Sequence, residues 1–190
     1  MDIGKSTIET IRDEILRVDA EWSERTKRGF RWWAHWNAQT IEVVGDGVGP
    51  DGKKDYVISI RTEMLRGVPA TTPMLKKLNS MVLPLATMYG VVHDPERETV
   101  ELRSAARVHE GNSDWMTWML GTAALMQLDA TGHLGGYLAE QLEVEEAISG
   151  HPRSGERSEP DEMLDAIDAV IIPQGHSDIR SNKWFRLTAY

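Results

Sequence analysis

Residues 29–65 of the chain read GFRWWAHWNAQTIEVVGDGVGPDGKKDYVISIRTEML, and this stretch decides the fold because it holds three strand patterns in succession. Large side chains alternate between the two faces of residues 30–36, as they do on a β-strand. Residues 40–44 and 56–65 repeat the pattern. The Gly- and Asp-rich segment 45–52 between them is typical of a hairpin turn. The sequence therefore predicts an antiparallel three-strand meander.

An amphipathic helix is predicted before this meander. Ser6 and Glu9 fit a capping box, in which each side chain satisfies a free backbone N–H, so the helix is expected to start at Ser6. Its apolar stripe has steps of three and four residues and consists of Ile8, Ile11, Ile15, Val18 and Trp22.

Three further elements are predicted after the meander. Thr72-Pro73 opens a second helix, which Pro84 is expected to kink or end. Residues 89–93 and 99–109 form a hairpin whose second strand alternates apolar and charged side chains. Residues 112–114 then cap a long helix that extends to Ile148, weakened by several glycines.

The element order α-β-β-β-α-β-β-α predicts an α+β fold. We expect a five-stranded antiparallel sheet with helices packed on one face. The expected domain covers residues 1–148, followed by a polar linker at 149–160. Residues 161–190 add a C-terminal extension with an amphipathic helix and an apolar tail.

The composition limits the classes of function. The 190 residues are enough for one core, and the net charge is −9. Residues 138–168 hold ten acids and two bases, which is −8 of that total. An acidic balance argues against a nucleic-acid partner. The acidic stretch is either a solvated surface or a docking surface for a basic partner segment.

Membrane insertion and disulfide bonding are not expected. The chain has no cysteine, which excludes a disulfide framework and a thiolate metal site. No apolar run approaches the roughly 20 residues that cross a bilayer. A cytoplasmic location is therefore the expectation.

The sequence contains no catalytic motif. The spacing Gly45-x-Gly47-x-Gly49 resembles part of a dinucleotide fingerprint, but it lies between two strands and is interpreted as a hairpin loop. His93 and His109 would lie close together if the second hairpin paired its ends. Surface histidines at strand ends are far commoner than a metal or acid–base pair. We predict no catalytic residue, no metal and no cofactor.

Aromatic side chains give the best indication of a binding surface. Trp33 points away from its neighbours in a regular strand, so it is expected to be exposed beside Arg31 and His35, and exposed Trp and Arg are typical of interface hot spots. The other tryptophans considered, namely Trp32, Trp36, Trp115 and Trp118, are expected in the core. Trp184 and Phe185 belong to an apolar tail that either folds back on the domain or docks on a second subunit or another protein.

The order, length and acidity of the elements from Ser6 to Ile148 resemble the type III secretion chaperone-like (TY-Chap) superfamily, including its YbjN-like group. The resemblance implies a curved antiparallel sheet with helices on one face. It also implies a homodimer that binds extended segments of partner proteins without a cofactor, as a chaperone or adaptor. Residues 149–190 depart from the short-chaperone pattern.

Two classes of function follow from these observations. The first is a non-enzymatic protein-binding module, homodimeric, that uses the face around Trp33 and the sheet edges. The alternative is a small-molecule-binding protein or enzyme with a pocket between sheet and helices. That pocket would be lined by the methionine stripe Met74, Met81, Met88, Met116, Met119 and Met126, although methionine at this spacing is commonly core filler.

Overall fold

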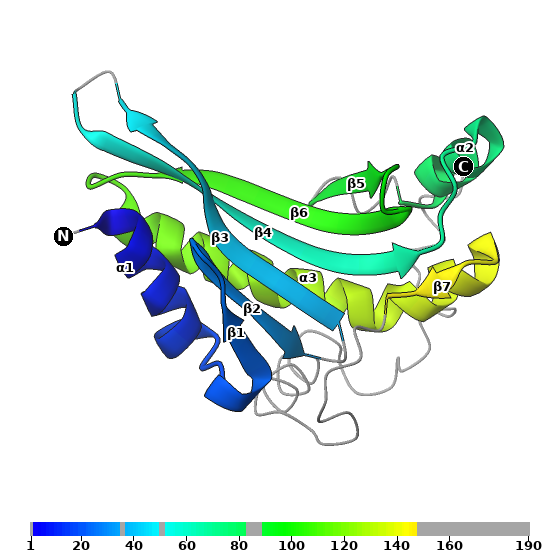
Figure 1. Cartoon of the computed structure of the whole chain (residues 1–190), viewed down its shortest axis with the longest axis horizontal. Helices are drawn as coiled ribbons and strands as arrows, with labels where there is room; N and C mark the ends of the chain where they lie inside the picture. The colour runs from blue at the N-terminus through cyan, green and yellow to red at the C-terminus, as the bar shows by residue number, and fades with distance from the viewer. Residues whose placement is uncertain (1, 35–36, 50–51, 83–88, 148–190) are drawn as a thin grey trace, which may run out of the picture.

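The structure is a computed structural model that describes residues 2–34, 37–49, 52–82 and 89–147 (Figure 1). The predicted linker and C-terminal extension lie outside the described residues, as do His35 and Pro84. The helices and strands are α1 (Ile3–Thr10), β1 (Ser23–Arg25), β2 (Gly29–Ala34), β3 (Asn37–Val48), β4 (Lys54–Arg66), α2 (Thr72–Val82), β5 (Gly90–Asp94), β6 (Thr99–Val108), α3 (Ser113–Leu142) and β7 (Glu145–Glu146).

The predicted α+β class with an antiparallel sheet is confirmed. The sheet has the order β1-β2-β3-β4-β6-β5, and β7 pairs with β4. It holds seven strands rather than the expected five. The two additional strands are β1 and β7, with three and two residues, which are too short to show an alternating pattern. The meander and the β5–β6 hairpin occur in the predicted order. However, β3 is longer than the predicted strand at 40–44 and includes the first half of the segment 45–52 that was expected to be a turn.

The first helix starts and ends earlier than predicted. Asp2, rather than Ser6, caps α1, because its carboxylate accepts the N–H of Lys5 at 3.0 Å. A π-helical segment, Ile11–Ile15, continues the helix. The chain then turns at Arg17, whose φ is +48°. The rest of the predicted stripe therefore lies beyond the helix, and Trp22 belongs to a separate 3₁₀ turn.

The last helix is continuous from Ser113 to Leu142, and its glycines do not interrupt it. Gly121 has a packing role, since a Cβ at this position would lie 2.7 Å from Ile15 Cδ1. The π-helical segment and α3 thus approach each other more closely than an alanine would allow. The helix ends at Leu142, before the predicted Ile148, and its C-cap Glu143 adopts a left-handed conformation with a φ of +57°.

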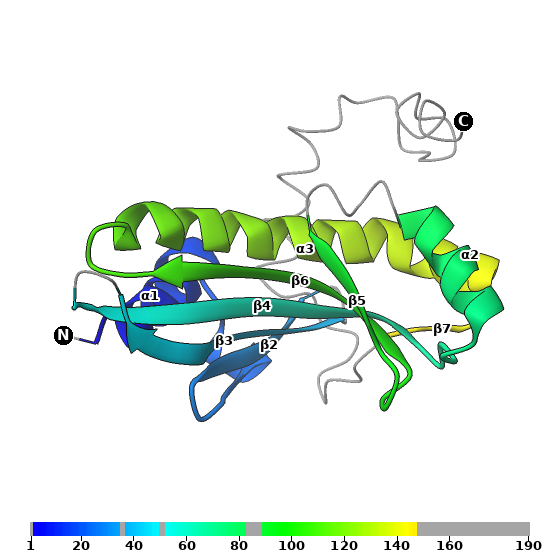
Figure 2. The same cartoon turned by 90° about the horizontal axis from the view of Figure 1, so that it is seen from above.

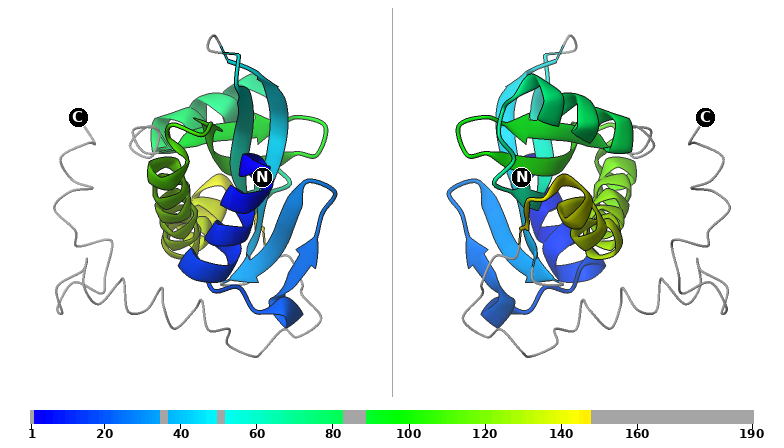
Figure 3. Two further views of the ribbon diagram at one scale, coloured as in Figure 1. Left: turned by 90° about the vertical axis from the view of Figure 1, so that its left-hand side faces the viewer. Right: turned by 90° about the vertical axis from the view of Figure 1, so that its right-hand side faces the viewer.

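Both α1 and α3 lie on one side of a sheet that curves around them (Figures 2 and 3). The core between these layers has two clusters. The larger joins α1 and the first half of α3 to β2, β3 and β4, and the second joins α2 and the rest of α3 to β4 and β6. On β4, the predicted inward residues Tyr56, Ile58, Ile60, Thr62 and Met64 are all buried.

A chain of buried hydrogen bonds ties the sheet to α3 through this core. The Gln39 side chain accepts the Trp32 indole N–H at 3.0 Å and donates to Thr62 Oγ1 at 2.8 Å. It also donates to the backbone carbonyl of Ala124 at 2.9 Å. Gln39 is fully buried and thereby satisfies three polar groups that water cannot reach. Within the described ranges, no helix combines the length and apolar character needed to cross a bilayer.

Candidate functional site

The helix-free face of the sheet is the side away from α1 and α3 (Figure 2). It carries charged side chains in cross-strand rows. On β4 and β6, Arg61 is directly opposite Arg103, and Glu63 is directly opposite Glu101. Like charges at directly opposed positions destabilise a sheet. This face therefore needs opposite charges next to each row.

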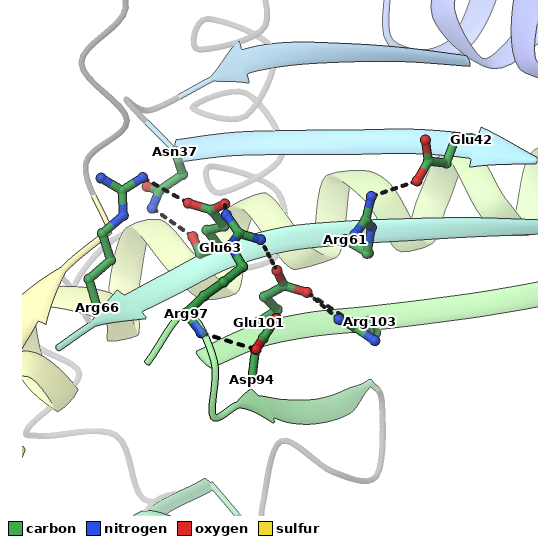
Figure 4. Close-up of polar contacts among 9 residues, drawn as sticks. All are labelled: Asn37, Glu42, Arg61, Glu63, Arg66, Asp94, Arg97, Glu101 and Arg103. Carbon is green, nitrogen blue, oxygen red and sulfur yellow. Dashed lines mark hydrogen bonds and ion pairs between the residues drawn. The ribbon is translucent and has the colours of Figure 1, made fainter. Parts of the chain in front are cut away.

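Arg97 supplies part of that compensation from the turn between β5 and β6 (Figure 4). One nitrogen of its guanidinium lies 2.6 Å from Glu63 Oε1, and the other lies 3.2 Å from Glu101 Oε1. Arg66 holds the second oxygen of Glu63 at 2.8 Å, and Arg103 holds that of Glu101 at 2.8 Å. Both carboxylates are buried, with side-chain exposures of 10% and 2%, so their charges are paired on both oxygens.

The ionisation of Glu63 reflects two opposing effects. Burial raises the pKa of its carboxyl, and the hydrogen bonds and charges of Arg66 and Arg97 lower it. The arginines outweigh burial, so the net pKa lies below the ordinary value. The same contact with Glu63 raises the pKa of Arg97. Glu63 is therefore a paired anion near neutral pH, which suits a fixed charge better than a proton donor.

The structure brings Arg31 and Trp33 together but corrects the predicted exposure of Trp33. The Arg31 guanidinium lies over the Trp33 ring, 5.4 Å from its centroid. Trp33 is only 7% exposed because it packs with Trp22 and Ala38. Trp22 was expected in the first helix, so the sequence pattern gave no reason to place it over this strand. The other residues predicted for binding, His35, Trp184 and Phe185, lie outside the described residues.

The prediction that Trp115 and Trp118 belong to the core is wrong. Their exposed fractions are 67% and 63%, and that of Met119 is 46%. The opposite face of α3 already packs on the sheet through Leu120, among others. The sequence does carry a signal for this surface, since the first half of α3 is apolar on all sides, and a surface helix normally has one polar face.

The surface of the described residues has several cavities. One, of about 430 Å³, is between α1 and the β1–β2 turn, and another, of about 280 Å³, is between α1 and the start of α3. A third, about 160 Å³, lies on the helix-free face of the sheet. None of the three has a methionine in its wall, so they do not include the predicted methionine-lined pocket.

The two histidines considered for acid–base chemistry do not meet. His93 is paired with Val100 near the start of β6, whereas His109 follows the far end of that strand, roughly 30 Å away at strand spacing. His93 Nε2 lies 2.7 Å from the carbonyl oxygen of Val68. His109 Nδ1 accepts the backbone N–H of Gly111 at 3.1 Å. Within the part of the chain that the structure describes, no group of three acidic or histidine side chains has the arrangement of a metal site.

The chain matches no protein-family model, and no curated protein matches it. The resemblance to the TY-Chap superfamily therefore stays a prediction.

Proposed function

We propose that this protein is a non-enzymatic, homodimeric polypeptide-binding module that acts as a chaperone or adaptor. The observation that carries the proposal is the exposed apolar face of α3, formed by Trp115, Trp118 and Met119. Exposed apolar patches of this kind are typical of interaction surfaces. Tryptophan is also among the residues that contribute most to interface affinity.

The sequence of this face favours a second copy of the chain as its occupant. In an antiparallel pair of α3 helices related by a two-fold axis between Leu125 and Met126, facing residue numbers sum to 251. The facing pairs would be Trp115 with Gly136, Met119 with Gly132, Trp118 with His133 and Thr122 with Asp129. Large side chains at one end of the helix thus meet glycines at the other, and the Thr122 hydroxyl meets a carboxylate.

This pairing also accounts for the exposed glycines of α3. Gly132 and Gly136 are exposed within a continuous helix, where each costs about 1 kcal/mol relative to alanine. A facing tryptophan ring or methionine side chain would occupy the space that a larger residue would fill. A two-fold interface repeats every such contact, because each protomer contributes the same surface.

The area of the exposed rings is consistent with a stable dimer. A tryptophan side chain buries up to about 250 Å², so Trp115 and Trp118 together offer roughly 300 Å² per protomer at their observed exposures of 67% and 63%. Two copies would contribute about half of the roughly 1,200 Å² that begins the range of specific interfaces. Met119 and Tyr137, both 46% exposed, add to this area.

The sheet offers a separate surface for a partner polypeptide. Among the described strands, β5 pairs with β6 only as far as Arg103, so residues 104–108 of β6 pair with β4 alone. Unpaired backbone groups at such an edge accept an extended segment by β-augmentation. The helix-free face next to this edge adds charged side chains that select the segment.

Light scattering after size-exclusion chromatography tests the proposal on the full chain. We expect a dimer for the wild-type protein and a monomer for Trp118→Glu, because the substitution places two carboxylates in the apolar contact. The matched control is Val48→Glu, which changes a residue that is 71% exposed at the end of β3. It is expected to remain dimeric. A wild-type protein that is monomeric at every concentration tested would contradict the homodimer.

One observation favours the alternative of a small-molecule binder. The cavity of about 430 Å³ falls in the usual size range of ligand pockets. Its wall combines an apolar part, which includes Ile8 and Tyr56, with basic residues such as Lys27. The Thr26 hydroxyl in this wall is buried without a hydrogen-bond partner. An amphipathic carboxylate such as octanoate is the ligand to test, by thermal shift on wild-type and Lys27→Glu protein.

A further inference from the structure

The cavity of about 160 Å³ on the helix-free face is lined by three arginines, two glutamates and two small residues. These are Arg31, Arg61, Arg97, Glu63, Glu101, Ala38 and Thr40. Arg31 is directly opposite Thr40, and Thr40 is directly opposite Arg61, so the three residues form one row across β2, β3 and β4. The row places a hydroxyl between two guanidinium groups.

Arg31 differs from the other arginines of the charged network and of β6. Arg61, Arg66, Arg97, Arg103 and Arg107 each form an ion pair with a carboxylate. Among the described residues, Arg31 has no carboxylate within ion-pair distance, although Glu24 is directly opposite it on β1, and its guanidinium lies over the Trp33 ring. The Nε atoms of Arg31 and Arg61 are both buried without a hydrogen-bond acceptor. Two guanidinium groups that face one cavity thus retain unused donor capacity, which is costly for buried polar groups.

The charges in the wall select the type of anion. Three guanidinium groups and two carboxylates line the wall, and Glu24, Glu42, Arg66 and Arg103 lie next to them. These five guanidinium groups and four carboxylates have a net charge of about +1 when all of them are ionised. The oxygens of Glu63 and Glu101 are already held by other arginines. A single carboxylate would neutralise the remaining charge, and guanidinium groups match carboxylates in geometry. A doubly charged phosphate would be repelled by the two buried glutamates.

We propose that this cavity binds one carboxylate of an extended acidic polypeptide segment, with Arg31 and Arg61 as the charged ligands and the Thr40 hydroxyl as a further donor. The proposal rests on the proposed polypeptide-binding function and names the chemistry of the partner. The segment lies along the sheet, where alternate side chains of an extended chain point toward the same surface. The Arg31 guanidinium already stacks on the Trp33 ring, so its side chain loses less conformational freedom when the carboxylate binds.

The test follows the arginine Nε–Hε resonances of the ¹⁵N-labelled full chain by NMR. The probes are a short capped alanine peptide with a central glutamate, the same peptide with glutamine, sodium acetate and inorganic phosphate. We expect the glutamate peptide to shift the Arg31 and Arg61 resonances in a saturable way, and the glutamine peptide to leave them unchanged. Arg31→Gln is expected to weaken binding at least tenfold. Arg31→Lys is expected to weaken it less, since lysine keeps the charge but lacks the paired N–H donors of a guanidinium.

Arg107→Gln is the matched control, because Arg107 is 71% exposed, lies on the same sheet and is absent from the cavity wall. It is expected to bind the glutamate peptide as the wild type does. No shift of the Arg31 and Arg61 resonances with the glutamate peptide would overturn the proposal. Acetate binding as tightly as the peptide would overturn the polypeptide source, and tighter binding of phosphate would overturn the charge argument. Oligomeric state measured in the same samples separates these failures from a failure of the proposed dimer.

Discussion

Arg97 offers the sharpest test of the polar network on the helix-free face. Replacement by glutamine removes the guanidinium that lies 2.6 Å from Glu63 and 3.2 Å from Glu101. Each carboxylate keeps one arginine, Arg66 or Arg103. The substitution removes two charge-assisted hydrogen bonds. It also removes a positive charge that offsets the repulsion between the opposed carboxylates of Glu63 and Glu101.

The expected loss is moderate because Arg97 is 51% exposed and water screens its charge. Charge-assisted hydrogen bonds contribute about 1.5–3 kcal/mol each when buried. With screening, we expect Arg97→Gln to lower the free energy of unfolding by about 2 kcal/mol in total. For a protein of this length, that corresponds to a fall of roughly 4–8 °C in Tm.

The effect is expected to depend on pH in a defined direction. Burial raises the pKa of Glu63, but its two arginines outweigh burial, so the net pKa lies below the ordinary value. This contribution to stability is therefore present above the ordinary glutamate pKa of about 4.3 and is lost as the pH falls through the lowered folded value. The difference between wild type and Arg97→Gln should shrink at low pH, because protonation of Glu63 removes its ion pair with Arg97 from the wild-type protein.

Urea unfolding followed by tryptophan fluorescence at pH 7 and near pH 3 measures both effects. Arg107→Gln is the control, since its ion pair with Asp55 spans 3.4 Å and its side chain is 71% exposed. We expect it to change the unfolding free energy by less than about 0.5 kcal/mol. The reasoning is refuted if Arg97→Gln loses no more stability than this control at pH 7, or if its loss is the same at both pH values.

Three other outcomes are expected from the core. Gln39→Leu leaves the Trp32 indole N–H and other buried groups without partners, so urea unfolding should show a loss of about 3 kcal/mol; an unchanged midpoint would contradict the bridge to α3. Gly121→Val should lower Tm by several degrees, because even a Cβ at this position would lie 2.7 Å from a carbon of Ile15. Gly47→Val is the control and should leave Tm unchanged, since no atom lies near its Cβ position. Burial, with a smaller effect of a nearby carboxylate, raises the pKa of Tyr89 to about 12, so an alkaline absorbance titration should lose one late-ionising tyrosine in Tyr89→Phe.

The strands and the long helix could be predicted because each has a repeating pattern over many residues. The inward set of β4 and the predicted hairpin of β5 and β6 appear in the structure as expected. The strands β1 and β7 have only three and two residues, which is too short for a repeating pattern. They are strands because they pair with a longer neighbour. The helix start at Asp2 was missed because Ser6 and Glu9 offer a second cap signal one turn later.

The exposure of single tryptophans could not be predicted from alternation alone. Trp33 does lie on the helix-free face, but Trp22 covers it from a turn whose position depends on where the first helix ends. Trp115 and Trp118 have helical spacing, and the sequence does not indicate which side of a nearly all-apolar helix meets the sheet. The charged network was missed because Arg97 belongs to the β5–β6 turn and reaches Glu63 on β4, which is not adjacent to that turn in the sequence.

The most direct test of the central claim uses single cysteines on α3, because the chain has none of its own. Two-fold antiparallel pairing places position 125 within about one residue of the symmetry axis, close to its copy, and places the two copies of position 137 roughly 35 Å apart along the helices. The account predicts that Leu125→Cys, with Met126→Cys as a second variant, forms a disulfide-linked dimer of the full chain under mild oxidation. Tyr137→Cys, at an exposed position, should stay unlinked. Equal cross-linking at both positions, or none near the axis, would contradict the proposed dimer.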